Sequence, residues 1–334
     1  MKILVIRLSS LGDIILTQPI CAILQRVYPH ADIHYICKPG YTELLQMFDP
    51  PVTPIAYSQS LAFHKAMRKE KYDIVIDLHG KLASILLRLI VKAKKRVGYN
   101  KKRSTRIAIV KGDKLLSIDS TISLYANSLK KLGIEPLWQY PKLQSRVERH
   151  AVATDSIRQA KIAIFPGATH FTKRYPTQSW IKLMQLLPLY SFSLFGSADD
   201  QNNCSVIAAQ NPANCKNLAG KFEFGSLLDA LQDYDLIISG DTGPMHLAAT
   251  LFKSQIAIFG GTHPRLGFRP LNDSATILCA ELPCQPCSLH GLKQCPLDHF
   301  KCMKSIEPGK VAALIQELLA KPKYWRNAKR ANLT

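Results

Sequence analysis

The sequence predicts an α/β protein with two doubly wound domains, each built on a parallel sheet. Three observations support this prediction. Short apolar segments alternate with amphipathic ones in the first half of the chain, the alternation lapses around residues 138–160, and it restarts at residue 161. Strands that alternate with helices form parallel sheets covered on both faces. The 334 residues suffice for two such domains with separate cores.

The first domain is expected to begin with a buried strand over Lys2–Ile6 and a helix over Gly12–Val27. Further strands are expected over 32–37 and 74–78, and further helices over 41–47 and 82–91. After Trp138 the chain becomes polar and charged, which favours a linker. We therefore place the first domain at residues 1–155.

The second domain repeats the pattern. Its expected strands are 161–165, 191–195, 236–238 and 255–259, and its expected helices are 178–187, 225–231 and 244–251. This domain takes residues 156–310. The remaining segment, 311–334, continues a predicted helix that starts at Pro308, and we expect it to pack back across the hinge. Parallel sheets bind ligands at the carboxyl ends of their strands, so two such domains facing each other offer an interdomain cleft.

The composition is that of a globular cytoplasmic protein. Hydrophobic residues make up 47% of the chain and charged residues 20%, and no apolar run reaches the roughly 18–20 residues that span a bilayer. The apolar start, Met1 to Ile6, is too short for the core of a signal peptide. In the cytoplasm the nine cysteines are expected to stay mostly reduced.

The charge is strongly basic and unevenly distributed. Lys and Arg total 44 against 24 acidic residues, a net charge of +20, and the segment from Leu78 to Gly112 holds eleven basic residues and no acidic one. Such a field attracts nucleic acid, an anionic membrane face or a multiply charged anionic substrate. The simpler alternative is a solvated basic face.

Two strand-to-helix junctions carry polar groups suited to chemistry. The first follows the first strand and contains Ser9, Ser10, Gly12 and Asp13, although an acidic residue at this position also simply stabilises a helix N-terminus. The second runs from Phe165 to Pro176 and combines a glycine, hydroxyl groups and a Lys-Arg pair, as a phosphate clamp would.

A third junction spans residues 236–251. A short apolar strand leads into the turn Ser239–Gly243, and Pro244 suits the first turn of the helix that follows. Free backbone N–H groups and the positive helix end make this junction a ready anion site. The alternative is an ordinary turn capped by Asp241 or Thr242.

Together the three junctions resemble the ADP-heptose:lipopolysaccharide heptosyltransferases of glycosyltransferase family 9. The family patterns are Ser-Ser-x-Gly-Asp, found at Ser9–Asp13; Pro-Gly-Ala-x4-Lys-Arg-Trp-Pro, found at Pro166–Pro176 with Tyr175 for Trp; and Asp-(Thr/Ser)-Gly-x-x-His, found at Asp241–His246. The resemblance implies the GT-B architecture, with two Rossmann-like domains around a cleft. It also implies inverting transfer of a heptose from ADP-heptose to the inner core of lipopolysaccharide.

The resemblance also implies roles for single residues. Asp13 would be the general base that deprotonates the acceptor hydroxyl, and Lys173 would stabilise the departing diphosphate. The start of the helix at Gly243 would bind that diphosphate, and Asp241 would accept from sugar hydroxyls. No divalent metal or other cofactor is required in this scheme. The donor-binding set is Thr169, Asp199, Asp200, Asp241, Thr242, Gly243, Met245 and His246.

The same family context gives the basic segment a partner. Acceptors in this pathway carry lipid A phosphates and Kdo carboxylates and lie in the cytoplasmic leaflet, so we expect a peripheral enzyme on the anionic inner face of the cytoplasmic membrane and no nucleic acid. The expected acceptor-binding residues are Ser9, Ser10, Gly12, His79, Lys94, Lys95, Arg96, Lys101, Lys102, Arg103 and Arg106.

Four late cysteines form one more pattern. Cys284, Cys287, Cys295 and Cys302 are spaced C-x2-C-x7-C-x6-C, with His290 and His299 nearby. Closely spaced cysteines of this kind indicate a structural zinc site. Disulfides and free thiols are the alternatives.

Three rival functions are weighed against family 9 transfer from ADP-heptose. A nicotinamide-dependent dehydrogenase is disfavoured, because the first strand-to-helix turn has Gly12 alone and lacks Gly-x-Gly-x-x-Gly. A basic nucleic-acid-binding protein would explain the charge but not the Lys173 and Asp241 junctions. A family member that uses another nucleotide sugar is the alternative within the enzyme class.

Overall fold

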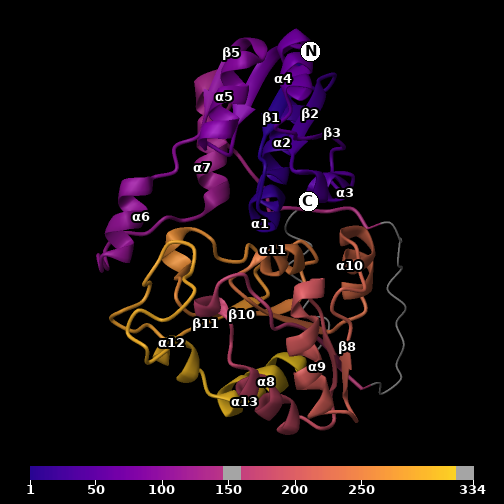
Figure 1. Ribbon diagram of the computed structural model, residues 1–334, viewed down its shortest axis with the longest axis vertical. Helices are drawn as coiled ribbons and strands as arrows, with labels where there is room; N and C mark the ends of the chain where they lie inside the picture. The colour runs from indigo at the N-terminus through magenta and orange to yellow at the C-terminus, as the bar shows by residue number, and fades with distance from the viewer. Residues whose placement is uncertain (146–158, 321–334) are drawn as a thin grey trace. The chain divides into compact units, whose positions relative to one another are not determined.

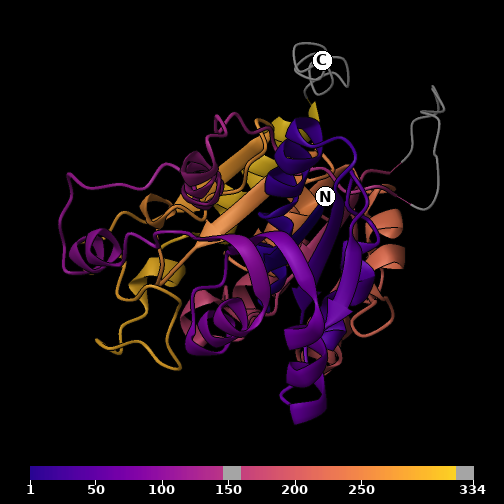
Figure 2. The ribbon, with the colours of Figure 1, turned by 90° about the horizontal axis from the view of Figure 1, so that it is seen from above.

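The computed structural model describes residues 1–145 and 159–320, which form two units. The first unit takes Met1–Ser104 and Asp119–Ser145, and the second takes Thr105–Ile118 and the described chain from residue 159 onward. Each unit holds one sheet of strands that run side by side (Figure 1 and Figure 2). The predicted α/β class with two doubly wound sheets is confirmed.

The sheet of the first unit has the strand order β3-β2-β1-β4-β5, all parallel. Leu4 and Ile6 pack in one apolar cluster with α4 and α5, whereas the hydroxyl of Tyr35 on the other face lies 2.6 Å from Thr17 Oγ1, just before α2. The elements are β1 (Lys2–Ile6), α1 (Leu11–Ile15), α2 (Gln18–Val27), β2 (Asp32–Cys37), α3 (Thr42–Leu45), β3 (Thr53–Ala56), α4 (Leu61–Lys69), β4 (Lys71–Asp77), α5 (Leu82–Ile90), β5 (Lys92–Gly98) and α7 (Thr121–Ser128).

The sheet of the second unit has the parallel order β11-β10-β9-β6-β7-β8. One face packs on α8, α9 and α13 through Ile162, Ile164 and Trp180, and the other on α11 through Met245 (Figure 1). The elements are β6 (Lys161–Phe165), α8 (Thr177–Gln185), β7 (Ser191–Leu194), α9 (Gln201–Ala209), β8 (Cys215–Asn217), α10 (Phe224–Leu231), β9 (Leu236–Gly240), α11 (Gly243–Ala249), β10 (Ser254–Phe259), β11 (Ala275–Cys279), α12 (Lys301–Lys304) and α13 (Pro308–Ala320).

Short 3-10 turns complete the described chain. They are η1 (Pro39–Tyr41), η2 (Leu129–Leu132), η3 (Phe171–Lys173), η4 (Ala198–Asp200) and η5 (Pro264–Leu266), and helix α6 (Arg103–Val110) crosses from the first unit into the second. Among residues 1–145 and 159–320, no helix has the length and apolar character that crossing a bilayer requires.

Each sheet has one point where the strand order reverses. The chain enters the first sheet at β1, moves outward through β2 and β3, and returns on the other side of β1 as β4. The second sheet does the same, with β6 at its centre and β9 as the returning strand. In open parallel sheets the crevice at such a switch point, beyond the carboxyl ends of the strands, is where ligands bind.

One predicted helix is divided in the structure, and several elements were not predicted, namely β3, β5, β8, β11, α4, α6, α7, α9 and α12. The expected helix over 12–27 is divided into α1 and α2, because Pro19 in the first turn of α2 has no N–H to continue a helix from before it. The basic residues of 92–98 form the edge strand β5, which was not predicted. Its Lys-rich sequence breaks the apolar pattern of a central strand but suits an edge, where charge prevents pairing with other chains.

The domain boundaries remain predictions. The expected boundary at residue 155 and most of the expected C-terminal segment 311–334 lie outside the described residues. Within the described part, α13 contacts α8 and places Val311, Ala312 and Ile315 in the core of the second unit.

Candidate functional site

Arg7 is the centre of the switch point in the first unit. It directly follows β1, and its guanidinium donates to Leu78 O after β4 at 2.6 Å and to Ser9 O at 2.8 Å. A third nitrogen lies 2.7 Å from Asp13 Oδ2. The buried side chain therefore ties the ends of the two central strands to the Ser9–Asp13 turn. Arg7 was not predicted from the sequence, although a lone cation at the end of an apolar strand was a usable signal.

Asp13 lies in the first turn of α1 and is held by three neighbours. Its Oδ2 accepts from Ser10 Oγ at 2.8 Å and Ser10 N at 3.2 Å, and Tyr125 donates to Oδ1 at 3.4 Å. Burial alone would raise the pKa of Asp13, but the Arg7 charge and the Ser10 hydrogen bonds outweigh it and lower the pKa to about 2. The carboxylate is therefore ionised at neutral pH and keeps 19% of its side-chain surface exposed.

His79 follows β4 at the same switch point. The buried carboxylate of Asp77 fixes this turn by accepting from the backbone N–H groups of His79 and Gly80 and from Ser84 Oγ. Burial, followed by the charge of Arg7, lowers the pKa of His79 to about 4, so the imidazole is neutral at pH 7. Its Nδ1 is buried and has no hydrogen-bond partner among the described residues.

Lys173 and Asp241 meet at the switch point of the second unit. Lys173 ends η3 in the segment after β6, and Asp241 directly follows β9. The ammonium lies 2.8 Å from Asp241 Oδ2 and also donates to Asp241 O at 2.8 Å, and Thr262 Oγ1 donates to Oδ2 at 2.7 Å. The structure thus brings together two residues, 68 positions apart in sequence, that were assigned to the same donor site. Thr262 was not predicted.

Two glycines permit this contact. A Cβ at Gly240 would lie 2.8 Å from Lys173 O, and one at Gly260 would lie 2.4 Å from Thr172 O. Real Cβ atoms do not approach backbone oxygens this closely, so any side chain at either position would displace the Lys173 segment. Glycine at the ends of β9 and β10 is a requirement of the site.

The remaining donor-binding predictions fall into two groups. Thr169 and Asp199 are exposed, and Thr242 is the N-cap of α11, directly before Gly243. By contrast, the side chains of Met245 and His246 are buried, and Met245 packs with Ala257 and Phe259. A ligand at the start of α11 would meet backbone rather than the Met245 side chain.

Asp200 is held by its own turn. Its carboxylate accepts from the N–H of Ser197 at 2.9 Å and from Ser197 Oγ at 2.8 Å, which caps η4. It also lies against Gly167, where a Cβ would come within 2.0 Å of Asp200 Oδ1. Asp200 therefore fixes the β7 turn against the loop after β6.

The predicted basic surface is largely exposed, on and after β5. Lys94, Lys95, Arg96, Lys102 and Arg103 are exposed, whereas Lys101 is half-buried beside Gly80. Burial, followed by the charges of Arg7 and Lys81, lowers the pKa of Lys101.

Arg106 does not belong to this exposed surface, which corrects the expectation that it contacts the acceptor there. Its side chain is buried in the second unit, donates to Leu266 O at 3.1 Å and lies over the ring of Phe268. The guanidinium fastens α6 to the turn after β10.

An apolar stripe lies next to the basic strand. Leu82, Leu86 and Leu89 are 73%, 50% and 60% exposed, and their i, i+4, i+7 spacing places them on one face of α5. The following strand, β5, carries exposed Lys92, Lys94 and Lys95.

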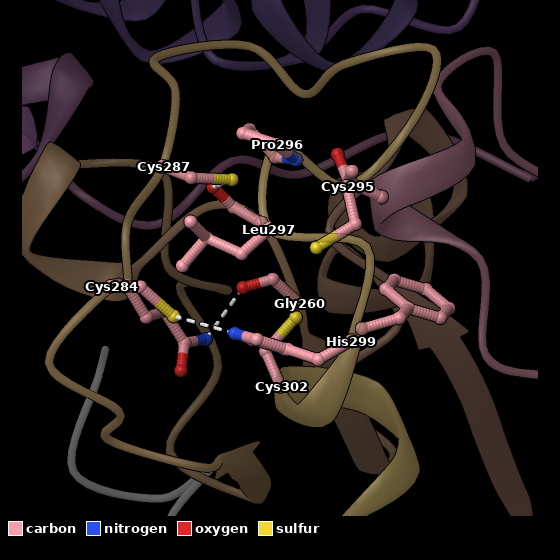
Figure 3. A pocket seen from close by; sticks show the side chains of 12 residues that line it. Gly260, Cys284, Cys287, Cys295, Pro296, Leu297, His299 and Cys302 are labelled. Carbon is pink, nitrogen blue, oxygen red and sulfur yellow. Dashed lines mark hydrogen bonds between the residues drawn. The ribbon is translucent and has the colours of Figure 1, made fainter.

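The four predicted cysteines also come together. Cys284, Cys287, Cys295 and Cys302 line one cavity of the second unit, together with His299 (Figure 3). His290 does not line it.

Comparison with known proteins gives a consistent result. The model of glycosyltransferase family 9 (heptosyltransferase) matches residues 60–299. Lipooligosaccharide heptosyltransferase 2 of Campylobacter jejuni is 26% identical over 335 residues, which cover 96% of this chain and 98% of that protein. Two solved structures share the fold over 96% of this chain and 98% of theirs. The Escherichia coli ADP-heptose LPS heptosyltransferase II has a TM-score of 0.73 at 23% identity, and a family 9 glycosyl transferase of Veillonella parvula has 0.77 at 20%.

Proposed function

The chain belongs to glycosyltransferase family 9, the heptosyltransferases, and we propose that it transfers a heptose from ADP-heptose to the Kdo and heptose inner core of lipopolysaccharide. One observation carries the proposal. The first unit presents an ionised carboxylate, Asp13, at its switch point, and the second presents an ammonium, Lys173, at its own. Glycosyl transfer needs one group of each kind, a base for the acceptor and a cation for the leaving group.

Asp13 is the proposed general base. It takes the proton of an acceptor hydroxyl while that oxygen attacks the anomeric carbon of the heptose, and the bond to the ADP diphosphate breaks in the same displacement. A single displacement inverts the configuration at this carbon. The low pKa of Asp13, about 2, keeps the carboxylate ionised at neutral pH. A positioned base contributes roughly 10²–10⁴-fold to the rate.

Lys173 is the proposed partner of the leaving group. Its ammonium, with the backbone N–H groups at the start of α11, meets the negative charge that develops on the diphosphate. Asp241 holds Lys173 at 2.8 Å and accepts from heptose hydroxyls. We infer a GT-B arrangement in which both switch points contact the bound substrates. This scheme uses no divalent metal.

The decisive experiment measures ADP release from ADP-heptose with a purified acceptor that carries lipid A and Kdo. We expect Asp13→Asn and Lys173→Met to lower kcat by about 10²–10⁴-fold. Glu135→Gln and Lys182→Met alter exposed residues of the same units and serve as matched controls with unchanged turnover. Turnover of Asp13→Asn near that of the unsubstituted protein would exclude this residue as the base.

The donor is tested separately by thermal shift with ADP, UDP and GDP. We expect ADP to raise Tm the most, because at equal concentration the ligand that binds the folded state most tightly stabilises it most. A preference for UDP or GDP would replace ADP-heptose by another nucleotide sugar.

We also propose that the enzyme is cytoplasmic and binds the anionic inner face of the cytoplasmic membrane. Leu82, Leu86 and Leu89 on α5 supply an apolar stripe, and Lys92 and Lys95 of the following strand β5 supply positive charge, whereas Lys94 pairs with Asp73 at 2.7 Å. Each Lys near an anionic surface contributes about 1 kcal/mol to membrane binding, and apolar side chains that enter the interface add to it.

Flotation with vesicles tests this surface. We expect binding to vesicles that contain phosphatidylglycerol, weaker binding at high salt, and none to phosphatidylcholine alone. Leu86→Ser with Leu89→Ser should reduce flotation, whereas Leu189→Ser, which changes a leucine of the second unit that is 81% exposed, should leave it unchanged. Binding that ignores both lipid charge and salt would contradict the proposal.

A further inference from the structure

Residues 280–300 form a long loop without a helix or strand of its own, between β11 and α12. Loops of this length in a folded domain are uncommon unless something other than regular secondary structure holds them. This one holds three cysteines, and a fourth follows at the start of α12. Apart from the cysteines, the apolar side chains that line the cavity in this loop are those of Pro296, Leu297 and Phe300, which is little for a small hydrophobic core.

All four cysteines point toward the same space. The sulfur atoms of Cys284, Cys287, Cys295 and Cys302 are directed into one cavity in Figure 3. The cavity volume is about 20 Å³, which is room for a single water-sized particle. A single metal ion bound by four thiolates is tetrahedral, which is the geometry typical of zinc or iron.

His299 completes the arrangement as a hydrogen-bond donor. Its Nδ1 accepts from Lys301 N at 2.9 Å, which leaves the ring proton on Nε2, and Nε2 lies 3.9 Å from Cys284 Sγ. An imidazole in this tautomer donates to a thiolate and does not coordinate a metal through Nε2. Such outer partners orient metal ligands and stabilise their charge.

We propose that Cys284, Cys287, Cys295 and Cys302 bind one thiophilic divalent metal ion, with zinc expected, which fastens the 280–300 loop to the Lys173 segment. On binding, the four thiols release their protons and form four metal–sulfur bonds, and no oxidant or reductant is needed. Bonds of about 2.3 Å require the thiol side chains to turn inward by rotation about Cα–Cβ.

The loop is already joined to the segment that carries Lys173. Thr172 N donates to Leu292 O at 3.2 Å, and Leu292 N donates to Thr172 Oγ1 at 2.8 Å. Cys287 N donates to Gly261 O at 3.1 Å. The neighbouring Gly260 lies so close to Thr172 O that a Cβ atom there would clash with it. A metal that fixes the cysteines thereby fixes Thr172 and Lys173, so its role is structural and its effect on turnover is indirect.

A second group of side chains with metal-ligating atoms lies at the end of β11. His263, Cys279 and Glu281 are the one set in the described residues whose ligand atoms all lie within 4.8 Å of one another. Both ring nitrogens of His263 are occupied, however, since Nε2 bonds Glu281 at 3.0 Å and Nδ1 accepts from Arg265 N at 3.1 Å. This set is a hydrogen-bonded turn and lacks a second or third thiolate.

The test is elemental analysis of the full chain, purified reduced and without a histidine tag after growth with added zinc and iron. We expect one equivalent of zinc per chain, and a loss of at least tenfold in occupancy for Cys284→Ser and for Cys302→Ser. Cys204→Ser changes a buried thiol of α9 outside the loop and should keep full occupancy. One equivalent of iron with the same dependence on cysteines supports the site and assigns iron to it.

Two results would overturn the site. These are less than 0.1 equivalent of zinc and iron together, or a disulfide between any two of the four cysteines in non-reduced peptide maps. His299→Ala is expected to keep one equivalent but to bind it 10–100-fold more weakly in chelator competition. Unchanged affinity would remove His299 from its supporting role.

The link to Lys173 rests on the proposed function and is tested apart from it. Chelation should lower Tm, increase proteolysis within 280–300, and lower ADP release. Metal that is bound but whose removal leaves Tm, proteolysis and turnover unchanged would contradict the anchoring role. Metal binding in a protein that transfers no heptose would refute the proposed function and leave the metal site intact.

Discussion

Each switch point carries one ion pair, and the two pairs differ in whether the cation or the carboxylate is the more buried partner. In the first unit the cation is the more buried partner, since the Arg7 side chain is 9% exposed and Asp13 is 19% exposed. In the second unit the acid is the more buried one, with Asp241 at 7% and Lys173 at 16%. At both switch points, therefore, a more buried charged side chain holds a more exposed partner of opposite charge in place.

This difference shows how one fold serves two chemical tasks. Arg7 is fixed by the backbone oxygens of Ser9, in the turn after β1, and of Leu78, directly after β4, so the charge that faces outward is the carboxylate. Asp241 is fixed by Thr262, so the charge that faces outward is the ammonium. Because the anchored partner is the cation in the first unit and the carboxylate in the second, the first unit presents a base and the second presents a cation for the leaving group.

The largest expected effect comes from removing the anchor of the first pair. Arg7→Met leaves Asp13 partly buried without its cation and should lower the free energy of unfolding by about 3–5 kcal/mol, as breaking a buried pair does. Burial then dominates and the pKa of Asp13 rises, so the acid limb of kcat/KM should move to higher pH. Urea unfolding and a pH–rate profile measure the two effects. Arg68→Met, at an exposed site, should stay within about 0.5 kcal/mol. A loss below 1 kcal/mol for Arg7→Met would show that Asp13 needs no anchor.

Removing the anchor of the second pair should cost less. In Asp241→Asn the amide oxygen still accepts from Thr262, and Lys173 still donates to the backbone oxygen of residue 241. We expect a loss of about 1–3 kcal/mol, the range for one buried polar partner. Thr262→Val removes the hydrogen bond to Asp241 Oδ2, which Asp241→Asn keeps, and should cost a similar amount because it also removes one buried polar partner. If Asp241→Asn were as destabilising as Arg7→Met, the two anchors would be equivalent and the comparison would lose its basis.

The sequence was sufficient for the fold class and for Asp13, Lys173 and Asp241, but Arg7, the partner of Asp13, was not predicted. The apolar strands at 2–6, 32–37 and 161–165 are continuous runs between turn residues, and the structure has them with the same bounds. Strand β5 was not predicted, because four of its seven residues are Lys or Arg and an edge strand need not be apolar. The helix is divided at Thr17 because Pro19 has no backbone N–H to donate to the preceding turn, although the proline itself is visible in the sequence.

The pairing of charges could not be predicted from the sequence. Lys173 and Asp241 meet because β6 and β9 are neighbours in the sheet, and strand order is a property of the whole fold. The burial of Arg106 has the same origin, since residues 105–118 join the second unit while residues 119–145 return to the first. Local charge density is visible in a sequence, but which unit a charged segment packs against is not.

A smaller effect is expected at Ser10, which supports the low pKa of Asp13. Ser10→Ala removes the 2.8 Å hydrogen bond from Oγ and should raise the pKa of Asp13 from about 2 toward its usual 3.8. A lowered carboxyl pKa stabilises the folded state above pH 4 and loses this contribution as the pH falls toward 2. The unsubstituted protein should therefore exceed Ser10→Ala in Tm above pH 4, and the difference should shrink between pH 4 and pH 2. A difference that is constant across this range would indicate a structural effect unrelated to Asp13.

The smallest effect is expected at Tyr125, the third neighbour of Asp13. Its hydroxyl donates across 3.4 Å, near the limit of a hydrogen bond, while its ring is fully buried and stays in place in Tyr125→Phe. We expect a change in unfolding free energy of about 0.5 kcal/mol or less and a turnover within about threefold of the unsubstituted enzyme. Tyr57→Phe, at a half-buried tyrosine of the same unit that packs against Phe63, serves as the control. A loss of turnover comparable to that of Asp13→Asn would mean that Tyr125, rather than Arg7, orients the carboxylate, and the buried partner that holds the base would then be an uncharged one.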